Sequence, residues 1–237
     1  MYNEIGNIEN CVAEALATGR RITDDLEIVI VDDASTDGSG ALADRLAERH
    51  PELNVVHHAQ NRKLGGALRT GFAAATKEWV LYIDSDLPIV MDDALGAIPL
   101  TQGADMVIGN RQGRAEGLRR EVMSWVYNRL IRVLFGLKVH DVNFAFKLFR
   151  RAILNHITLQ SEGSFIDAEL LIETNQAGFA IAEIPLQYHE RVAGVSTLAS
   201  SSVVRTILRE LLAYRQAAAR RPARPAAPAT RRPAPHL

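Results

Sequence analysis

The stretch EWVLYIDSDLPIV, from Glu78 to Val90, joins an apolar run to two acids. The run Trp79–Ile83 predicts a buried strand. Asp84 and Asp86 follow it, and two neighbouring carboxylates repel each other unless a cation neutralises them. Mg²⁺ needs few protein oxygens because phosphate oxygens can complete its coordination shell. The stretch therefore predicts a seat for a metal ion and a diphosphate, although a DxD triplet alone is weak evidence.

The same alternation of apolar runs and helical patterns extends over the first half of the chain. This order predicts an α/β domain with a mostly parallel sheet and helices on both faces. Ligands of such sheets bind beyond the carboxyl ends of the strands. The pattern opens on a loop and a helix, so the first strand that such a domain normally has is missing from it. The predicted strands are 27–31, 54–58, 79–83 and 105–109, and the predicted helices are 38–50, 65–76 and 92–102.

A second acid pair, Asp32 and Asp33, follows the predicted strand at 27–31. Both acid pairs are expected to meet at one edge of the sheet. Capping of the next helix is the alternative role for the second pair. Residues 35–37 (Ser-Thr-Asp) could cap that helix equally well, so we expect Asp32 and Asp33 to contact a ligand.

A basic loop that contains glycine, NRKLGGALRTGF (Asn61–Phe72), leads into the predicted helix at 65–76. Helix N-termini and flexible backbone amides favour anions. Lys63, Gly65 and Gly66 are therefore candidates for approach to a nucleotide. An ordinary start of a helix is an equal alternative. The loop is not a P-loop, because GxxxxGK[ST] is absent.

The composition is typical of a soluble globular protein, with 237 residues of which 47% are apolar and 23% charged. The single cysteine, Cys11, cannot form an internal disulfide and favours a reducing, cytoplasmic location. The sequence has no apolar run of about 18 residues and no secretory signal. Six arginines and no acid lie in residues 215–237. Residues 220–237, rich in Pro, Ala and Arg, are expected to be disordered.

Two basic amphipathic helices are predicted in the second half of the chain, at about 118–134 and 202–219. Basic amphipathic helices can lie in a membrane interface, where Trp125 among arginines would also fit. The equal alternative is that both apolar faces pack on the core. The arginine-rich tail is either solvated or attracted to anionic lipid.

Seven short motifs follow one another along residues 1–200. They are YNE (Tyr2–Glu4), VDDASTDGS (Val31–Ser39), NRKLGGALRTGF (Asn61–Phe72), YIDSDL (Tyr82–Leu87), VIGNR (Val107–Arg111), FAFKLFRR (Phe144–Arg151) and EIPLQYHERVAGVST (Glu183–Thr197). Together they resemble the family 2 glycosyltransferases, in particular the polyprenyl-phosphate (dolichol-phosphate) mannosyl- and glucosyltransferases. The resemblance implies a GT-A (Rossmann-like, three-layer) fold, a nucleotide-diphosphate sugar donor, Mg²⁺ or Mn²⁺, and inversion at the anomeric carbon. We expect a GT-A domain at 1–200, an amphipathic helix at 201–219 and a tail at 220–237.

The resemblance assigns the donor site residue by residue. Asp84 and Asp86 match the family's DxD motif, with the first toward the sugar or ribose and the second toward the metal. Arg191 and Ser196 match a mobile loop that closes on the diphosphate. With Asp32 and Lys63 from the patterns above, the expected donor and nucleotide residues are Tyr2, Glu4, Asp32, Asp33, Lys63 and Asp84.

The acceptor site is assigned in the same way. Arg111, Arg120 and Ser124 resemble contacts to an acceptor phosphate, and Asp141 lies near the family's catalytic-base region. A lipid phosphate is largely dianionic at neutral pH and needs no strong base. A sugar hydroxyl would need one, for which Asp141 is the candidate. The expected catalytic residues are Asp86, Asp141 and Arg191.

The chain departs from the family pattern at Pro88, where close relatives often carry a glutamine. One metal ligand is therefore expected to be water instead of protein. His57 and His58 are expected to be structural, because the sequence indicates no partners that would make them metal ligands.

We expect an inverting hexosyltransferase that moves a sugar from a nucleotide-diphosphate donor to a polyprenyl phosphate. It would be cytoplasmic and peripheral on the inner face of the membrane, and nucleic acid is not an expected partner. The alternatives are a transferase with a soluble or saccharide acceptor, a non-catalytic module that binds sugar nucleotides, and a nucleotidyltransferase.

Overall fold

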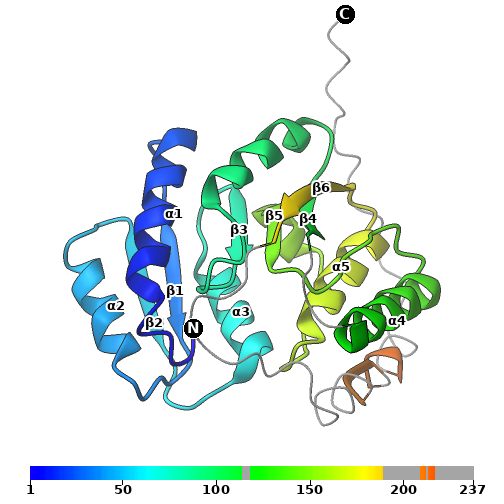
Figure 1. Cartoon of the computed structure of the whole chain (residues 1–237), viewed down its shortest axis with the longest axis horizontal. Coiled ribbons are helices and arrows are strands. Elements are labelled where there is room, and N and C mark those ends of the chain that lie inside the picture. The colour runs from blue at the N-terminus through cyan, green and yellow to red at the C-terminus, as the bar shows by residue number, and fades with distance from the viewer. Residues whose placement is uncertain (114–117, 189–208, 212, 217–237) are drawn as a thin grey trace, which may run out of the picture.

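The computed structural model describes residues 1–113, 118–188, 209–211 and 213–216, and for 118–123 it describes the helical backbone only. Strands and helices alternate over the first half of the chain, as predicted (Figure 1). Helices α1 and α2 lie with β1 and β2 on one side of the molecule, and α4 and α5 lie on the other. The elements are α1 (Ile8–Ile22), β1 (Ile28–Asp32), α2 (Ser39–Ala47), β2 (Leu53–His57), α3 (Lys63–Ala74), β3 (Trp79–Ile83), η1 (Met91–Gln102), β4 (Met106–Gln112), α4 (Leu118–Phe135), β5 (Phe146–Arg150), η2 (Arg151–Asn155), α5 (Ile166–Gln176) and β6 (Ile181–Gln187).

The strands of the described chain form two sheets. β1 and β2 pair in parallel, with Asp32 opposite His57. The second sheet has the order β3-β5-β4-β6, in which β4 and β6 are parallel and β5 is antiparallel to both of its neighbours. The α/β fold class is confirmed, but the sheet is mixed where we expected it to be mostly parallel. The difference arises because β5 inserts between β3 and β4, and the alternation of the first half contains no signal for it.

The predicted strand at 79–83 has the bounds of β3, and the other three predicted strands differ from β1, β2 and β4 by one to three residues at their ends. The predicted helix at 92–102 is the 3₁₀ helix η1. Pro99 inside it lacks the N–H group that a regular α-helix needs. This explains why the segment is not a regular α-helix.

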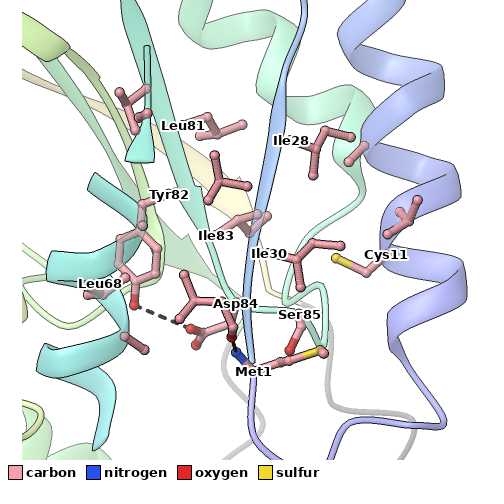
Figure 2. Close-up of a pocket in the computed structure, with 18 of the residues that line it drawn as sticks. Met1, Cys11, Ile28, Ile30, Leu68, Leu81, Tyr82, Ile83, Asp84 and Ser85 are labelled. Atoms are coloured by element: carbon pink, nitrogen blue, oxygen red, sulfur yellow. Dashed lines mark hydrogen bonds between the residues drawn. The ribbon is translucent and has the colours of Figure 1, made fainter. Parts of the chain in front are cut away.

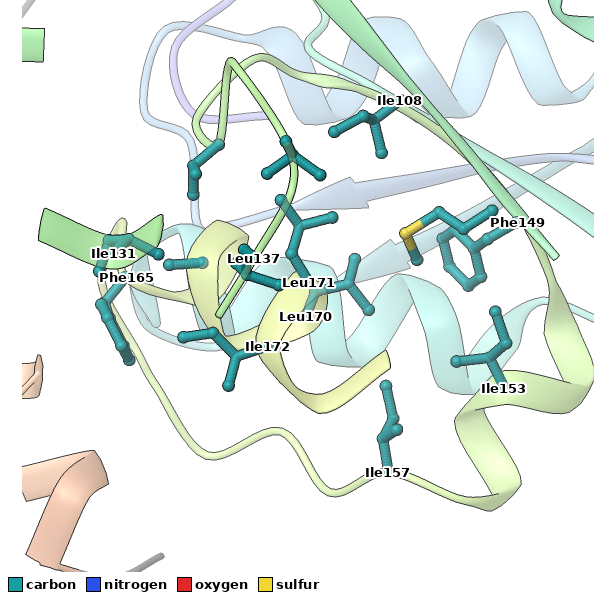
Figure 3. Close-up of a cluster of buried hydrophobic side chains, with 14 of the residues drawn as sticks. Ile108, Ile131, Leu137, Phe149, Ile153, Ile157, Phe165, Leu170, Leu171 and Ile172 are labelled. Carbon is teal, nitrogen blue, oxygen red and sulfur yellow. The ribbon is translucent and has the colours of Figure 1, made fainter. Parts of the chain in front are cut away.

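The largest apolar core lies between the second sheet and the helices α4 and α5 (Figure 3). Helix α5 is buried over the whole of residues 166–174. A helix that is buried all round shows no amphipathic period, so α5 escaped prediction. Ile131 of α4 enters the same core and is fully buried.

The C-terminal helix, described at 209–211 and 213–216, lies within the helix predicted at 202–219. Leu211 and Tyr214 are buried in the main core, and the Tyr214 hydroxyl donates to Glu173 Oε1 at 2.6 Å. The apolar face of the described part therefore packs on the core, which was the alternative to a membrane interface.

Glu210 on the same helix holds the loop that precedes α5. Its carboxylate accepts the N–H groups of Gly163 and Phe165, at 2.9 and 3.3 Å. The helix is therefore fixed by polar contacts as well as by its apolar face. The rest of the predicted helix and the tail at 220–237 lie outside the described residues.

Helix α4 presents an apolar face to solvent. Trp125 and Val133 are both 66% exposed, and Val126 and Leu134 are also exposed. We call these four residues the α4 stripe. Because this face is exposed, α4 could still lie in a membrane interface. The described part of the C-terminal helix could not, since its apolar residues Leu211 and Tyr214 are buried in the core. Within the described residues, no helix is both long and apolar enough to span a bilayer.

Candidate active site

One end of a cavity between β1 and β3 contains most of the predicted donor site. The cavity has a volume of about 670 Å³, and apolar side chains of β1, β3, α1 and α3 line its length (Figure 2). Its lining becomes acidic toward the carboxyl ends of the strands. The predicted residues that line it are Tyr2, Glu4, Asp33, Lys63, Asp84 and Asp86.

Asp84 follows β3 directly, and Asp86 lies in the turn after it. The Tyr82 hydroxyl donates to Asp84 Oδ1 at 3.3 Å (Figure 2). Burial, together with the charges of Asp167 and Asp84, raises the pKa of Tyr82, so its hydroxyl keeps the proton that it donates. The Asp84 carboxylate is therefore fixed by a hydrogen bond from a buried side chain. Sequence reasoning missed this role because Tyr82 lies within an apolar run and looks like an ordinary core residue.

A buried ion pair lies behind Tyr82. Lys147 is fully buried, and its Nζ lies 5.3 Å from the centroid of the Tyr82 ring. The same nitrogen donates to Asp167 Oδ1 at 2.5 Å and to the Phe144 carbonyl at 2.8 Å. Burial raises the pKa of Asp167, and Lys147 opposes this shift. Each charge of the pair is therefore hydrogen-bonded, as a buried ion pair requires, next to the Tyr82 ring.

The acids at this end of the cavity suit a hard divalent cation, because carboxylate oxygens are the ligands that Mg²⁺ and Mn²⁺ prefer. In the part of the chain that the structure describes, no group of three or more His, Cys, Asp or Glu side chains is arranged to hold a metal. Phosphate oxygens would therefore have to complete the shell. Burial, with a contribution from Asp86, raises the pKa of Cys11 to about 12.

Asp33 is 3% exposed and is fixed by two close contacts. Its Oδ1 accepts the Arg62 N–H at 2.7 Å and lies 2.6 Å from His58 Nδ1. His58 Nε2 in turn lies 2.8 Å from Thr70 Oγ1. His58 therefore positions Asp33, which fits the structural role expected for it, although sequence reasoning missed Asp33 as its partner. The contact arises because β1 and β2 pair in parallel, which brings the ends of the two strands, and with them Asp33 and His58, to one edge of the sheet.

Asp32 does not line the cavity. Its Oδ1 accepts the Ser35 N–H at 3.0 Å, and its Oδ2 lies 3.0 Å from His57 Nδ1. His57 Nε2 lies 2.9 Å from Asp44 Oδ1 on α2. This geometry supports neither the expected ligand contact nor capping of the helix, because the N-cap of α2 is Gly38 and has no side-chain hydrogen bond; Asp32 instead holds the turn before α2.

We expect His57 to make stability depend on pH. Hydrogen bonds with Asp44 and Asp32 raise the pKa of His57 above its usual value. Its stabilising effect is fully present below the unfolded pKa of about 6.5 and is lost as pH rises through the folded pKa. Solvent weakens the effect because the ring is 43% exposed. Between about pH 5.5 and 8.5, Tm should fall further in the unsubstituted chain than in His57→Gln. Parallel curves for the two proteins would contradict this assignment.

The glycines of the basic loop pack inside the protein. The Gly65 N–H donates to the Glu162 carbonyl at 2.8 Å, and a Cβ at position 65 would overlap the Ser161 carbonyl oxygen. Gly66 is also buried. The structure therefore supports an ordinary start of a helix for the two glycines. Lys63 is exposed, with a φ of 59°, and does line the cavity.

We expect Gly65→Ala to lower the free energy of unfolding by about 1–3 kcal/mol, because the new methyl group overlaps a backbone carbonyl. Gly103→Ala is the matched control, since nothing lies within 4 Å of a Cβ at that position. Urea unfolding measures both variants. If the two proved equally stable, the close approach at Gly65 would be wrong.

Arg111, at the end of β4, forms a bidentate ion pair with Asp141. Arg111 Nε donates to Oδ2 at 2.6 Å, and Nη2 donates to Oδ1 at 3.0 Å. The guanidinium also lies 5.2 Å from the ring centroid of Phe144 and 5.9 Å from that of Tyr188. Both oxygens of Asp141 accept from Arg111, which suits a residue that positions Arg111 better than a general base.

The other predicted acceptor residues lie on α4 or beyond the described residues. Ser124 is half-buried on α4, and Asn128, one turn later, accepts the N–H of Val142 at 3.2 Å. This contact fastens α4 beside the Arg111–Asp141 pair. The side chain of Arg120 and the residues Arg191 and Ser196 lie outside the part of the chain that the structure describes.

The family follows from a comparison with family models. Residues 1–158 match the model described as Glycosyl transferase family 2. The chain belongs to this family, and it is a glycosyltransferase.

Three individual relatives of the chain are named as sugar transferases of polyprenol, undecaprenyl phosphate or dolichyl phosphate. The chain is 31% identical over 217 residues to polyprenol monophosphomannose synthase of Mycolicibacterium smegmatis, covering 85% of this chain and 80% of that protein. It is 28% identical over 221 residues to undecaprenyl-phosphate mannosyltransferase of Micrococcus luteus, covering 85% and 86%. It is also 28% identical to dolichyl-phosphate beta-glucosyltransferase of Saccharomyces cerevisiae, covering 85% and 69%.

Solved structures support the fold. Glucosyl-3-phosphoglycerate synthase of Mycobacterium tuberculosis, in complex with Mn²⁺, UDP and phosphoglyceric acid, superimposes with a TM-score of 0.71 at 21% identity, covering 90% of this chain and 75% of that one. A mannosyltransferase of Pyrobaculum calidifontis, in complex with GDP-Man and Mn²⁺, gives a TM-score of 0.62 at 22% identity, covering 95% and 64%. The chain therefore has a GT-A-like fold.

Proposed function

We propose that this glycosyltransferase moves a hexose, with inversion, from a nucleotide-diphosphate sugar to a polyprenyl phosphate. The observation that carries the proposal is the meeting of the DxD acids with Asp33 and Glu4 at one end of a single cavity. The names of the three relatives given above, all polyprenol or dolichol sugar transferases, support the acceptor.

On the donor side, Tyr2, Glu4 and Asp33 would bind the nucleoside. Asp86, with Asp84, would hold a Mg²⁺ or Mn²⁺ ion. When bound, such an ion neutralises charge on the departing diphosphate. The hydrogen bond from Tyr82 keeps Asp84 pointed at the donor. Arg191 and Ser196 would add contacts to the diphosphate.

On the acceptor side, Arg111 would bind the phosphate, and Asp141 would fix the plane of the guanidinium. The lipid phosphate is already a strong nucleophile because it is largely dianionic at neutral pH. The reaction then needs orientation of the phosphate more than proton removal. Ser124 and Arg120 on α4 would complete the phosphate site.

The α4 stripe would bring the enzyme to the membrane surface. Its apolar side chains lie on the same helix as Arg129, which is exposed, and Arg132, and anionic lipid attracts such cations. The helix that carries Ser124 would then also carry the contact with lipid. We infer a peripheral position on the cytoplasmic face.

Loss of the stripe is expected to weaken membrane binding. Trp125→Ala combined with Val133→Ser should raise the Kd for vesicles that contain anionic lipid by about tenfold or more, because two apolar side chains no longer enter the interface. Leu100→Ser, an exposed apolar residue on η1, is the control. Sedimentation with vesicles measures binding, and equal loss in the control variant would contradict a specific role for α4.

A panel of donors and acceptors tests the reaction itself. GDP-, UDP- and dTDP-sugars are supplied with Mn²⁺ and either a short polyprenyl phosphate or 3-phosphoglycerate. Sugar transfer to the lipid phosphate alone supports the proposal. Transfer to phosphoglycerate alone would replace it with a soluble acceptor.

A further inference from the structure

A buried lysine lies in the middle of the second sheet. Lys147 of β5 lies opposite Tyr82 of β3 and opposite Ile108 of β4, so the three side chains are neighbours on one face of the sheet. Tyr82 and Ile108 belong to the main apolar core, and Lys147 is fully buried beside them. Its charge is paired with Asp167 of α5. Stability alone does not explain this pair, because apolar side chains of similar volume often serve a core equally well.

The donor half of the site contacts Lys147 through Tyr82. The Nζ atom lies 5.3 Å from the centroid of the Tyr82 ring, within the range in which a cation is attracted to an aromatic face. The hydroxyl of that ring donates to Asp84 Oδ1 at 3.3 Å (Figure 2). One ring therefore contacts the ammonium group and also binds the first acid of the DxD motif. A shift of the ring would move the hydroxyl that holds Asp84.

The acceptor half contacts the same nitrogen through Phe144. Nζ donates to the Phe144 carbonyl at 2.8 Å. The Phe144 ring packs on Gly109, where a Cβ would lie 2.7 Å from the ring, and the Arg111 guanidinium lies 5.2 Å from the ring centroid. Asp141, earlier in the same loop, makes the bidentate pair with Arg111. Lys147 thus holds the loop that carries both of these partners of Arg111.

We propose that Lys147 is a positioning residue that keeps the donor acid Asp84 and the acceptor pair Arg111–Asp141 in a fixed relation to each other. Because it is fully buried, it acts through Tyr82 and Phe144 and not on a substrate. Transfer between two bound substrates is sensitive to small misplacements of either one. The inference rests on the functions proposed above for the donor and acceptor sites.

The test removes the ammonium group without leaving a buried charge. Lys147→Met nearly keeps the shape of the side chain but leaves the Asp167 carboxylate unpaired, so Tm should fall by about 10 °C or more. Lys147→Met combined with Asp167→Asn is neutral and should recover most of that loss. The matched control makes the same two changes in the surface ion pair of Lys77 with Asp25, near the amino end of β3.

The kinetics of the double variant separate positioning from stability. We expect the KM for the nucleotide sugar and the KM for polyprenyl phosphate each to rise about fivefold or more, and kcat to fall about tenfold. The surface control should keep all three values. Unchanged KM and kcat in the double variant, or a change in the KM of one substrate alone, would overturn the proposal.

Tyr82→Phe tests the path to the donor. Alone, it should raise only the donor KM, because it removes only the hydrogen bond to Asp84. Added to the double variant, it should raise the donor KM little further, since both changes act through one contact. This coupling can be measured whether or not Tm recovers. A full additional rise in the donor KM would overturn the assigned path.

Binding of the donor without acceptor separates this inference from the proposed function. Isothermal titration with GDP-mannose and with UDP-glucose, each with Mn²⁺, should give a Kd about fivefold higher in the double variant than in the unsubstituted chain. If the unsubstituted chain transfers no sugar to polyprenyl phosphate, the proposed acceptor is wrong, but this difference in Kd still supports the donor half. Equal Kd values would overturn the proposal even where sugar transfer to the lipid phosphate is observed.

Discussion

Asp86→Asn is expected to abolish sugar transfer almost completely, with kcat/KM lower by about 10³-fold. The substitution removes the carboxylate assigned to the metal, so the charge that develops on the departing diphosphate is no longer neutralised. Asp84→Asn should mainly raise KM for the donor, because Asp84 is assigned to the sugar or ribose. The side chains differ by one group, so the fold should be unchanged.

Initial rates across a Mn²⁺ titration measure both variants. Asp24→Asn, an exposed acid far from the DxD turn in sequence, is the matched control and should retain full activity. If Asp86→Asn kept the rate of the unsubstituted enzyme at every Mn²⁺ concentration, Asp86 would not be the metal ligand. The chain would then still be an active transferase, but one whose catalysis does not depend on Asp86.

Asp141→Asn is expected to lower kcat/KM for polyprenyl phosphate by about 10²-fold, mostly through a higher KM for the acceptor. The carboxylate holds Arg111 through two hydrogen bonds, and an amide can accept only one of them. Arg111→Lys should behave alike, because an ammonium group cannot make the bidentate pair. Arg111→Ala is a poorer choice, since it leaves a buried carboxylate unpaired at a cost of about 3–5 kcal/mol.

The pH dependence of kcat separates the two roles of Asp141. A positioning residue leaves the shape of the profile unchanged, and Arg111→Lys then shows the same shift in KM. A general base would instead lower kcat in Asp141→Asn and remove the acidic limb of its profile. That outcome would contradict the role we infer from the ion pair.

Much of the donor site could be predicted because it depends on local pattern. The run at 79–83 fixed β3, and the two acids after it had to lie at the carboxyl edge of a parallel arrangement. Asp33 was found for the same reason. In each of these cases the strand and its side chain are adjacent in sequence, so no knowledge of distant pairing was needed.

The rest depends on contacts between residues far apart in sequence. The Arg111–Asp141 pair spans 30 positions, and the sequence offered each residue as a separate candidate. The contact of His58 with Asp33 requires the pairing of β1 with β2. The β5 strand and α5 are buried, so they lack the alternation of polar and apolar residues from which elements are predicted.

The C-terminal helix connects the end of the chain to the wall of the donor cavity. Glu210 binds the N–H groups on both sides of Ser164, and Ser164 lines that cavity. Thermodynamic reciprocity then applies to the two events. A donor that binds more tightly when this helix is docked must strengthen the docking by the same factor. For such a donor, a shortened chain that ends before residue 209 would lose that coupling free energy together with the helix.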